Sequence, residues 1–366
     1  MDYEEGCTVI LILGRAALDG RTYVAKNRDV PTINSPEIIR LSETGQEKTL
    51  GISSLEEPEG FTLGLNTQGV TVNTAGRFCH KPDNLGVSGG TIIKRSLAKA
   101  TGAKEATELI VEIVGKEGKS KNGTAFACVD PQEAYIVETY QKKSETIGPL
   151  KNVFFAYGNY MLSPGMKAFE KKKRGEKRAL RAENLLKERT GAITLPFLFR
   201  LMRDHETPPD LSLPWDDGNI CTHGYERDSR ASGICVLDRQ YPRWLSVLWA
   251  SLNLPCLTPF LPFYIGIREV PFAFTSARAY EIFEDLNLAL GKSPSLREAA
   301  RHFWEAFEYQ TLREAVPYEG NVRLSLERKN EAKAEEMLTT FVFARTREAL
   351  SSAEKMLRCG RYKGIL

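Results

Sequence analysis

The chain has 366 residues, of which 42% are hydrophobic and 27% charged, values typical of a soluble globular protein with a sizeable core. The formal net charge is only +3, so no overall electrostatic field indicates a nucleic-acid partner. The acidic start lacks the basic region of a secretory signal, the seven cysteines follow no disulfide spacing, and the longest apolar stretch, 244–267, contains three prolines. We therefore expect a cytoplasmic protein without a membrane-spanning segment.

The first part of the chain is predicted to form strands and hairpins. Thr8–Leu13 is an apolar run, and an Asp-Gly turn separates it from a second β-rich segment, Thr22–Ala25. Phe61–Leu65 and Val70–Asn73 flank the tetrapeptide Asn-Thr-Gln-Gly in a second hairpin pattern.

A helical region and three more strands follow. Apolar residues recur at helical spacing between residues 91 and 116. Ala125–Val129 and Ala134–Thr139 read as strands joined by an Asp-Pro turn, and Val153–Tyr157 reads as another strand.

The middle of the chain is predicted to be mixed. Lys167–Arg189 is interpreted as one long charged helix, and a second helix near Pro196–Arg203 has Thr194 as its predicted N-cap. Two β-like runs follow, Ser232–Asp238 and Trp244–Trp249.

The last quarter is predicted to be helical, because Ser295–Tyr309 and Leu324–Met356 are rich in Glu, Lys, Arg, Ala and Leu. These helices would cover a sheet or form an oligomer contact. Strands that come first, with helices between and after them, favour α+β layers around antiparallel sheets over regular βαβ alternation. No linker is evident, so we expect one domain.

Cys7 is the residue whose position suggests chemistry. Inside a chain its thiol would be mostly protonated near neutral pH and would have no evident base beside it. If the Gly6–Cys7 bond is cut, the new α-amine, with a reference pKa of about 7.7–8.0, lies on the same residue as the thiol and can accept its proton. The alternative is that Cys7 is a small apolar residue that opens a strand.

Several motifs, in this order, resemble those of one enzyme family. They are Gly6-Cys7-Thr8, Gly14, Ala16-Ala17, Asp19-Gly20, Lys26-Asn27-Arg28-Asp29, Gly64 to Asn73, Tyr157-Gly158-Asn159, Ile220-Cys221-Thr222-His223 with Ser232, Leu248-Trp249 through Pro255-Cys256, and Pro262 to Ile267 with Pro271. Together they resemble the cysteine dipeptidases and secernins, which are N-terminal-nucleophile (Ntn) hydrolases. The isopenicillin N acyltransferase and penicillin V acylase/bile-salt hydrolase families are more distantly similar.

The resemblance implies a fold and a maturation step. The fold would be the four-layer αββα sandwich of Ntn hydrolases, with antiparallel sheets and a helical C-terminal region. Residues 1–6 would be a short propeptide that autocleavage removes between Gly6 and Cys7, leaving 7–366 as a single Ntn-hydrolase domain.

The resemblance also implies roles for individual residues. Cys7 matches the nucleophile, and Asp29 matches the acid that orients the free α-amine. Asn73 and Asn159 match donors to the oxyanion of the tetrahedral intermediate. For these three polar residues the alternative from sequence alone is an exposed carboxylate or a turn asparagine.

Two further residues match substrate-binding positions. Lys26 lies where bile-salt hydrolases carry a functional arginine, and Ser232 matches a site serine of the acyltransferase branch.

The implied activity is that of a self-processing cysteine amidohydrolase or dipeptidase. It would cleave dipeptides or small N-acyl amino acids through a Cys7 thioester, without a cofactor, because the base is part of the chain. An acyltransferase and a non-catalytic secernin-like interaction protein remain open alternatives.

Two other sequence features could indicate a metal ion or a nucleic-acid partner, but neither predicts one. Cys221 and His223, considered with Cys79 and His80, lack the Cys-x2-4-Cys or His-x3-5-His spacing of a dedicated zinc site, so we expect no metal. The basic run at 171–181 is interleaved with acids, which favours a solvated helix face over a nucleic-acid interface.

Overall fold

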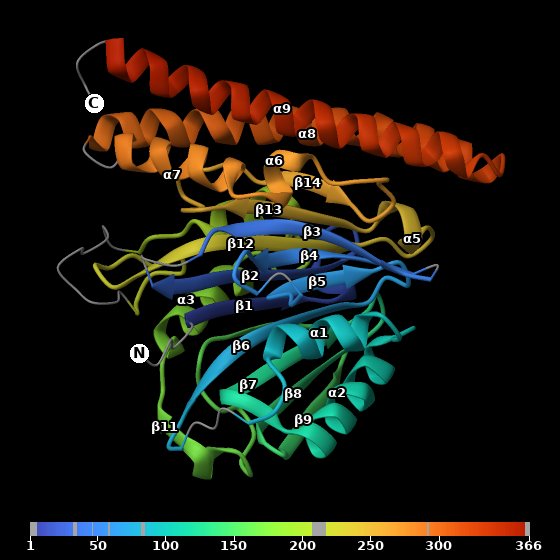
Figure 1. The fold of residues 1–366 in the computed structure, drawn as a ribbon, viewed down its shortest axis with the longest axis vertical. Helices are drawn as coiled ribbons and strands as arrows, with labels where there is room; N and C mark the ends of the chain where they lie inside the picture. Colours follow the sequence, from blue (N-terminus) through green and yellow to red (C-terminus); the bar gives the residue numbers. More distant parts are fainter. Residues whose placement is uncertain are drawn as a thin grey trace.

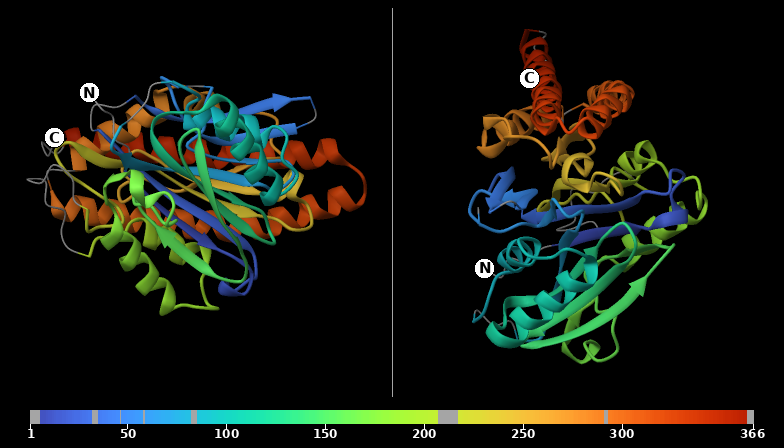
Figure 2. Two further views of the ribbon diagram at one scale, coloured as in Figure 1. Left: turned by 90° about the horizontal axis from the view of Figure 1, so that it is seen from below. Right: turned by 90° about the vertical axis from the view of Figure 1, so that its right-hand side faces the viewer.

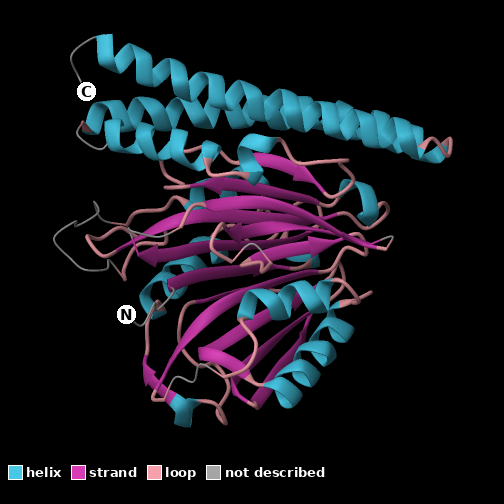
Figure 3. Ribbon diagram, in the orientation of Figure 1, coloured by secondary structure: helices cyan, strands magenta, loops and turns pink. Residues whose placement is uncertain are grey.

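The computed structural model of the chain describes residues 6–31, 35–45, 47–57, 59–81, 85–206, 217–290 and 293–362. Two antiparallel sheets are stacked in the middle of the molecule, and helices cover their outer faces (Figures 1 and 3). Residues 1–5 of the predicted propeptide lie outside the described residues.

The first sheet contains the strand that carries Cys7. Among the described residues its order is β10 (Phe154–Tyr157), β1 (Gly6–Ile12), β2 (Thr22–Pro31), β12 (Arg227–Leu237), β13 (Val247–Leu252) and β14 (Leu261–Tyr264). Every residue of β1 is buried. A run rich in β-branched and aliphatic residues suits a central strand covered on both faces.

The second sheet is built largely from consecutive hairpins. Its order is β3 (Glu37–Thr44), β4 (Glu47–Ser54), β5 (Leu63–Asn66), β6 (Thr71–Cys79), β7 (Lys119–Val129), β8 (Ala134–Gln141) and β9 (Lys143–Leu150), and the short β11 (Glu170–Lys172) also pairs with β6. The two sheets face each other where β1 packs on β6, β12 on β5 and β13 on β4.

Helices complete the outer layers. On the second sheet lie α1 (Gly89–Leu97) and α2 (Ala103–Glu117), whose Ile92 and Ile110 pack with Val72 and Phe126 in a separate hydrophobic cluster. On the first sheet, α3 (Glu176–Lys187) contacts β1 and β10, and α4 (Leu195–Met202) contacts β2. The order of layers is therefore helix, sheet, sheet, helix, as Figure 2 also shows from two further directions.

The last helices lie beyond the edge strand β14. They are α7 (Arg278–Leu290), α8 (Pro294–Glu327) and α9 (Glu331–Tyr362), preceded by the short α5 (Pro242–Leu245) and α6 (Phe272–Thr275). The helices α8 and α9 form a long antiparallel pair at one end of the molecule (Figure 1), and α9 packs on β14. No helix of the described ranges combines the length and the apolarity needed to cross a bilayer.

The predicted fold class is confirmed: the protein is α+β with antiparallel sheets and a helical C-terminal region. The predicted N-cap is also confirmed, because the Thr194 hydroxyl accepts a hydrogen bond from Phe197 N at 3.4 Å. The first predicted C-terminal helix is longer than expected, because α8 runs through Pro317 to Glu327, and the second is shifted along the chain, because α9 begins at Glu331 and ends at Tyr362.

Two sequence interpretations are wrong in detail. Lys167–Arg189 is not one helix, because Gly175 has the left-handed φ of 74° and only Glu176–Lys187 is helical after it. The predicted strand at Trp244–Trp249 begins as α5 and becomes β13 only at Val247. The helical spacing between residues 91 and 116 is confirmed and belongs to two helices, α1 and α2.

Candidate active site

Cys7 lies near the start of β1 with its side chain fully buried. In the antiparallel register Cys7 pairs with Arg28 of β2, and Val9 pairs with Tyr157 of β10. Because side chains alternate along a strand, Cys7, Val9, Arg28 and Tyr157 share one face of the sheet. That face meets β6 of the second sheet, since Arg77 of β6 lies over the Tyr157 ring at 5.4 Å.

The backbone N–H of Cys7 is held by a side chain. It donates to Oδ1 of Asn159 at 2.8 Å, although the two residues are 152 positions apart. Strand β10 ends at Tyr157, so beside Cys7 the Asn159 amide takes the place of a strand carbonyl. Asn159 is itself fixed, because its Nδ2 donates to Gly76 O at 3.0 Å and its backbone N donates to Arg174 O at 2.8 Å.

Arg178 of α3 joins the predicted residues into one buried network. Its Nη2 donates to Oδ1 of Asn159 at 3.0 Å and to the carbonyl oxygen of Cys7 at 3.4 Å. Its Nη1 forms an ion pair with Oδ2 of Asp29, and both side chains are fully buried. The planar guanidinium, with donors in fixed directions, is suited to bridging these three acceptors.

The sequence interpretation of Arg178 is wrong. It treats the basic run that includes Arg178 as a solvated helix face, yet the Arg178 side chain is 0% exposed while the neighbouring Lys177 is exposed. Lys177 and Arg178 are adjacent on α3, so the helix turns their side chains in different directions, and that of Arg178 faces β1. Residue composition does not show which of two adjacent basic residues of a helix faces the core, so the sequence gives no sign that Arg178 is buried.

Asp29 is placed by two partners. Its second carboxylate oxygen, Oδ1, accepts from the Ser229 hydroxyl at 2.7 Å. Register pairs Asp29 with both Gly6 and Ser229, so its backbone lies across from the residue that precedes the bond predicted to be cleaved. Structure therefore brings Cys7, Asn159 and Asp29 together through Arg178.

Asn73 of β6 approaches the same face from the other sheet. Its Oδ1 accepts from the Tyr157 hydroxyl at 3.5 Å. Its Nδ2 is buried and has no hydrogen-bond acceptor among the described residues. Leaving such a donor unpaired usually costs about 1–3 kcal/mol, so its presence requires an explanation.

Tyr157 lies between Asn73 and Cys7. Burial, the largest influence, raises the pKa of its phenol well above the ordinary range and outweighs the nearby Arg77 charge, which acts to lower it. The hydroxyl therefore stays protonated and can act as a neutral donor.

A buried ion pair supports Asn159 from the second sheet. Arg77 donates through Nε to Glu138 at 2.9 Å, and both side chains are 0% exposed. The Nη1 of Arg77 donates to the Gly158 carbonyl at 2.8 Å, directly before Asn159.

The two predicted substrate-binding residues, Lys26 and Ser232, lie on opposite faces of the first sheet. Lys26 shares the face of Arg28, and its ammonium donates to the Thr62 carbonyl at 3.1 Å, to Thr74 Oγ1 at 3.1 Å and to the Thr62 hydroxyl. Ser232 pairs with Asn27, which pairs with Thr8, so these three side chains lie on the opposite face of the sheet from Cys7. The structure thus brings Lys26 to the Cys7 side of the sheet and does not bring Ser232 there.

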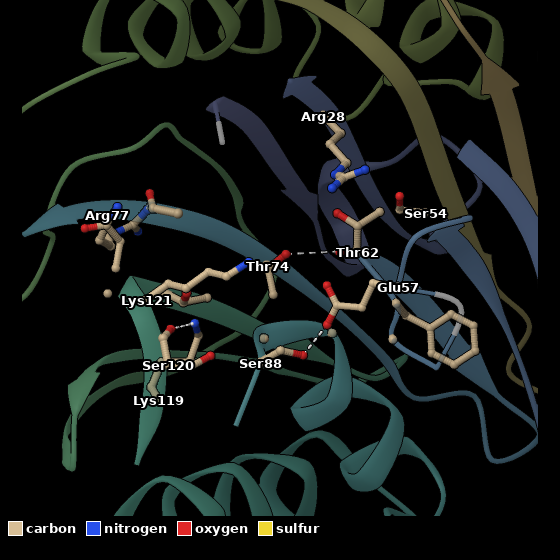
Figure 4. A pocket seen from close by; sticks show the side chains of 18 of the residues that line it. Arg28, Ser54, Glu57, Thr62, Thr74, Arg77, Ser88, Lys119, Ser120 and Lys121 are labelled. Carbon is tan, nitrogen blue, oxygen red and sulfur yellow. Dashed lines mark hydrogen bonds between the residues drawn. The ribbon is translucent and has the colours of Figure 1, made fainter. Parts of the chain in front are cut away.

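A cavity of about 140 Å³ opens next to this network. Arg28 and Gly76 line it, the first a cross-strand neighbour of Cys7 and the second the acceptor of Asn159. Figure 4 shows Arg28 on one wall and Lys119 and Lys121 on the opposite wall.

The two sequence pairs considered for a metal site, Cys79 with His80 and Cys221 with His223, do not come together in one site. Cys79 packs with Tyr140 and two methionines, away from Cys221. Cys221 and His223 instead meet His205 and Cys256, and the ligand atoms of these four residues all lie within 4.8 Å of one another. His205 and Cys256 were missed because they are distant in sequence from both pairs.

No protein-family model matches the sequence, and no curated protein matches it significantly. Solved structures with a similar backbone include a mutant of conjugated bile acid hydrolase from Clostridium perfringens, with a TM-score of 0.45 and 9% identity over 71% of this chain and 92% of that chain. An N-acylethanolamine-hydrolyzing acid amidase ortholog from Caenorhabditis elegans gives a TM-score of 0.44 and 14% identity over 67% and 99%. Penicillin V acylase from Agrobacterium tumefaciens gives 0.42 and 12% over 70% and 85%. At these values the similarity assigns neither a substrate nor a reaction to this chain.

Proposed function

We propose that the protein is a cysteine amidohydrolase whose nucleophile, Cys7, becomes the N-terminal residue by autocleavage after Gly6. The observation that carries this proposal is the hydrogen bond from the Cys7 nitrogen to Oδ1 of Asn159 at 2.8 Å. That nitrogen is an amide in the full-length chain and would be the α-amine after cleavage. Any buried strand N–H needs an acceptor, but here that acceptor is a side-chain oxygen that also accepts from Arg178, in place of a strand carbonyl.

The proposed base is the α-amine of Cys7. With a reference pKa of about 7.7–8.0, an α-amine is partly neutral near pH 7 and can accept the thiol proton directly or through one water. Asn159 would orient the amine, and the Arg178–Asp29 ion pair would hold Asn159 in place. The thiolate would attack the amide carbonyl and form a thioester, and the protonated amine would deliver its proton to the leaving nitrogen.

The proposed oxyanion donor is Nδ2 of Asn73. A buried donor without an acceptor among the described residues is ready to bind negative charge that develops in the transition state. Asn159 differs from Asn73 because both ends of its amide are hydrogen-bonded: its Oδ1 accepts from Cys7 and Arg178, and its Nδ2 donates to Gly76. We therefore propose that Asn159 orients the amine and that Asn73 stabilises the oxyanion.

The cavity supports small anionic substrates. Among the described residues, four basic side chains and one acidic side chain line it, and the acid, Glu57, accepts a hydrogen bond from Ser88. Arg77 is paired with Glu138 and Arg28 with Glu37, so the charge that favours a carboxylate comes from Lys119 and Lys121. Dipeptides and short N-acyl amino acids combine a cleavable amide with such a carboxylate, and we propose them as the substrate class.

The test is a panel of dipeptides and N-acyl amino acids, each paired with its amide-capped analogue. We expect cleavage of the free acids that is lost in Cys7→Ala, and products detected by mass spectrometry as free acid and amine. A matched control is Cys128→Ala, since Cys128 is equally buried but packs between the second sheet and its helices. Activity that persisted in Cys7→Ala would exclude the thiol as nucleophile, and products conjugated to an added amine would indicate acyl transfer in place of hydrolysis.

A further inference from the structure

Three separate segments bring four metal-binding side chains to one point behind the first sheet. His205 follows α4, Cys221 and His223 precede β12, and Cys256 lies in the loop between β13 and β14. Cys221, His223 and Cys256 are buried and His205 is half-buried. Two thiols and two imidazoles are the donor set of tetrahedral zinc sites.

Three of the six distances between the ligand atoms fit the edges of a zinc tetrahedron, and all six are within 4.8 Å. With Zn–S of about 2.3 Å and Zn–N of about 2.0–2.1 Å, ideal tetrahedral geometry gives S···N edges of about 3.6 Å and an N···N edge of about 3.3 Å. Both sulfur atoms, of Cys221 and Cys256, lie 3.5 Å from Nε2 of His223. The Nε2 atoms of His223 and His205 are 3.1 Å apart.

Hydrogen bonding alone does not explain this arrangement. The Nε2 atom of His223 faces three heteroatoms at once, yet a ring nitrogen carries either one hydrogen or one lone pair. Its other nitrogen, Nδ1, faces the Asp228 carboxylate at 3.5 Å, and Arg230 keeps that carboxylate paired at 3.3 Å. A proton on Nδ1 leaves the Nε2 lone pair directed at the centre of the cluster, which is the arrangement of a ligating histidine with a carboxylate behind it.

The surrounding backbone holds the ligands in place. The Cys221 N–H donates to Asp204 O at 3.2 Å, which ties the segments of Cys221 and His205 together. Arg203 donates to Pro255 O at 2.6 Å and to Thr258 O at 2.8 Å, which fixes the loop of Cys256 on both sides. Preorganised ligands from three segments are what a structural metal site requires.

We propose that His205, Cys221, His223 and Cys256 bind one Zn²⁺ as a closed structural site. Four protein ligands leave no open position for substrate, so the ion would stabilise the fold and take no part in amide cleavage. This assignment does not depend on the proposed hydrolase activity, because the metal content of the protein can be measured without a substrate.

The site lies next to the residues that place Asp29. Between the ligands Cys221 and His223, Thr222 donates through its N–H to the Ser229 hydroxyl at 3.0 Å, and its carbonyl accepts from the Ser229 N–H at 2.9 Å. That hydroxyl donates to Asp29 at 2.7 Å. Zinc would therefore rigidify a segment that is two hydrogen bonds from the candidate active site.

The first test measures zinc in the full chain, expressed in zinc-containing medium and purified without chelator under reducing conditions. Elemental analysis should give about one zinc per chain, and native mass spectrometry should show the same stoichiometry. Replacement by Co²⁺ should give the intense visible absorption of a tetrahedral thiolate site. Prolonged chelation should remove the ion and lower the thermal midpoint, and added Zn²⁺ should restore it.

Variants test the ligand assignment. Cys256→Ser and His205→Ala should lose most of the bound zinc, whereas Cys79→Ser, a buried cysteine outside the cluster, should keep it. Asp228→Asn should keep a weaker site, with zinc affinity reduced about 10–100-fold. If the ligand variants are insoluble, zinc titration of the metal-depleted wild-type chain decides the question.

Two results would overturn the proposal. One is a reduced wild-type chain that contains no zinc and takes up none in titration. The other is a chain purified without reductant whose Cys221 and Cys256 resist alkylation and whose mass is lower by two hydrogens, which would show a disulfide between the two sulfur atoms.

Discussion

The backbone nitrogen of Cys7 donates a hydrogen bond to the side-chain oxygen of Asn159 at 2.8 Å, across 152 residues of sequence. The interaction exists before any cleavage of the chain, so the geometry that would orient a free α-amine is already present in the full-length protein. An α-amine formed here would keep the same acceptor, and in its neutral form its lone pair could accept the thiol proton.

Maturation is the most direct consequence of that geometry. We expect the purified wild-type protein to lack residues 1–6, and Cys7→Ala to retain them apart from removal of the initiator Met. The reason is that the Cys7 sulfur is the proposed attacking group on the Gly6 carbonyl. Intact-mass measurement distinguishes the two proteins. Equal processing in both would point to an external protease, and no processing in either would remove the proposed base.

Arg178 should matter through the position of Asn159. In Arg178→Lys the charge beside Asp29 remains, but one ammonium cannot reproduce the fork that contacts Asp29, Asn159 and the Cys7 carbonyl. We expect maturation to slow and kcat to fall by about 10²-fold, the usual effect of misplacing a reacting group by about 1 Å. Single-turnover kinetics on the folded fraction measures this.

The control for Arg178 is its exposed neighbour. Lys177→Met removes a charge one position away on the solvent side of α3 and should leave maturation and turnover unchanged. A matching loss of activity in Lys177→Met would mean that any disturbance of α3, and not the loss of the guanidinium contacts, is responsible.

Asn73 and Asn66 form a contrasting pair on one hairpin. Asn73 has a buried Nδ2 without an acceptor among the described residues, so Asn73→Ala should fold and lower kcat by about 10²–10³-fold, or about 3–4 kcal/mol of barrier, with little change in substrate binding. Asn66 has its hydrogen-bonding capacity filled, with Nδ2 on the carbonyls of Leu97 and Ala100 at 2.8 Å each. Asn66→Ala should cost about 2–4 kcal/mol of stability and leave turnover per folded molecule intact.

Denaturation curves and kcat values for both asparagine variants decide between the two roles. If Asn73→Ala lost activity only in proportion to folded protein, Asn73 would be a structural residue and the oxyanion assignment would fail.

Glu138 predicts a pH dependence of stability. Burial by itself would raise the pKa of this carboxyl, but the Arg77 guanidinium and hydrogen bonds from Ser163 and Leu162 outweigh burial and hold the pKa below its ordinary value. A carboxyl whose folded-state pKa is lowered stabilises the fold above its unfolded pKa, and that contribution is lost as pH falls through the folded value. The free energy of unfolding should therefore decline as pH is lowered below about 4.5.

Glu138→Gln isolates this contribution. Removing one partner of a buried ion pair typically costs about 3–5 kcal/mol, so we expect the variant to be less stable at pH 7 by about that amount. Its stability should also fall less steeply on the acid side than that of the wild type. Urea denaturation at a series of pH values measures both quantities, and parallel acid limbs in the two proteins would show that other carboxyls dominate.

The sequence by itself determined the fold class and the residues worth examining. Local patterns suffice for this, because the run of apolar and β-branched residues at 8–13 predicts a buried strand, and turn residues mark the hairpin between β5 and β6. The family resemblance singled out Cys7, Asp29 and Asn159, which the structure connects within hydrogen-bonding distance through Arg178.

Tertiary structure alone decided which side chains meet. Arg178 is buried because of its helical phase, and Ser232 lies on the far face of its sheet because of strand register. Within the described part of the chain, Asn73 has a donor without an acceptor because of how the two sheets are stacked. The four proposed zinc ligands come from three segments whose sequence spacing resembles no metal motif. Contacts of this kind depend on sheet register and layer packing over long sequence separations, and local composition and periodicity carry no information about them.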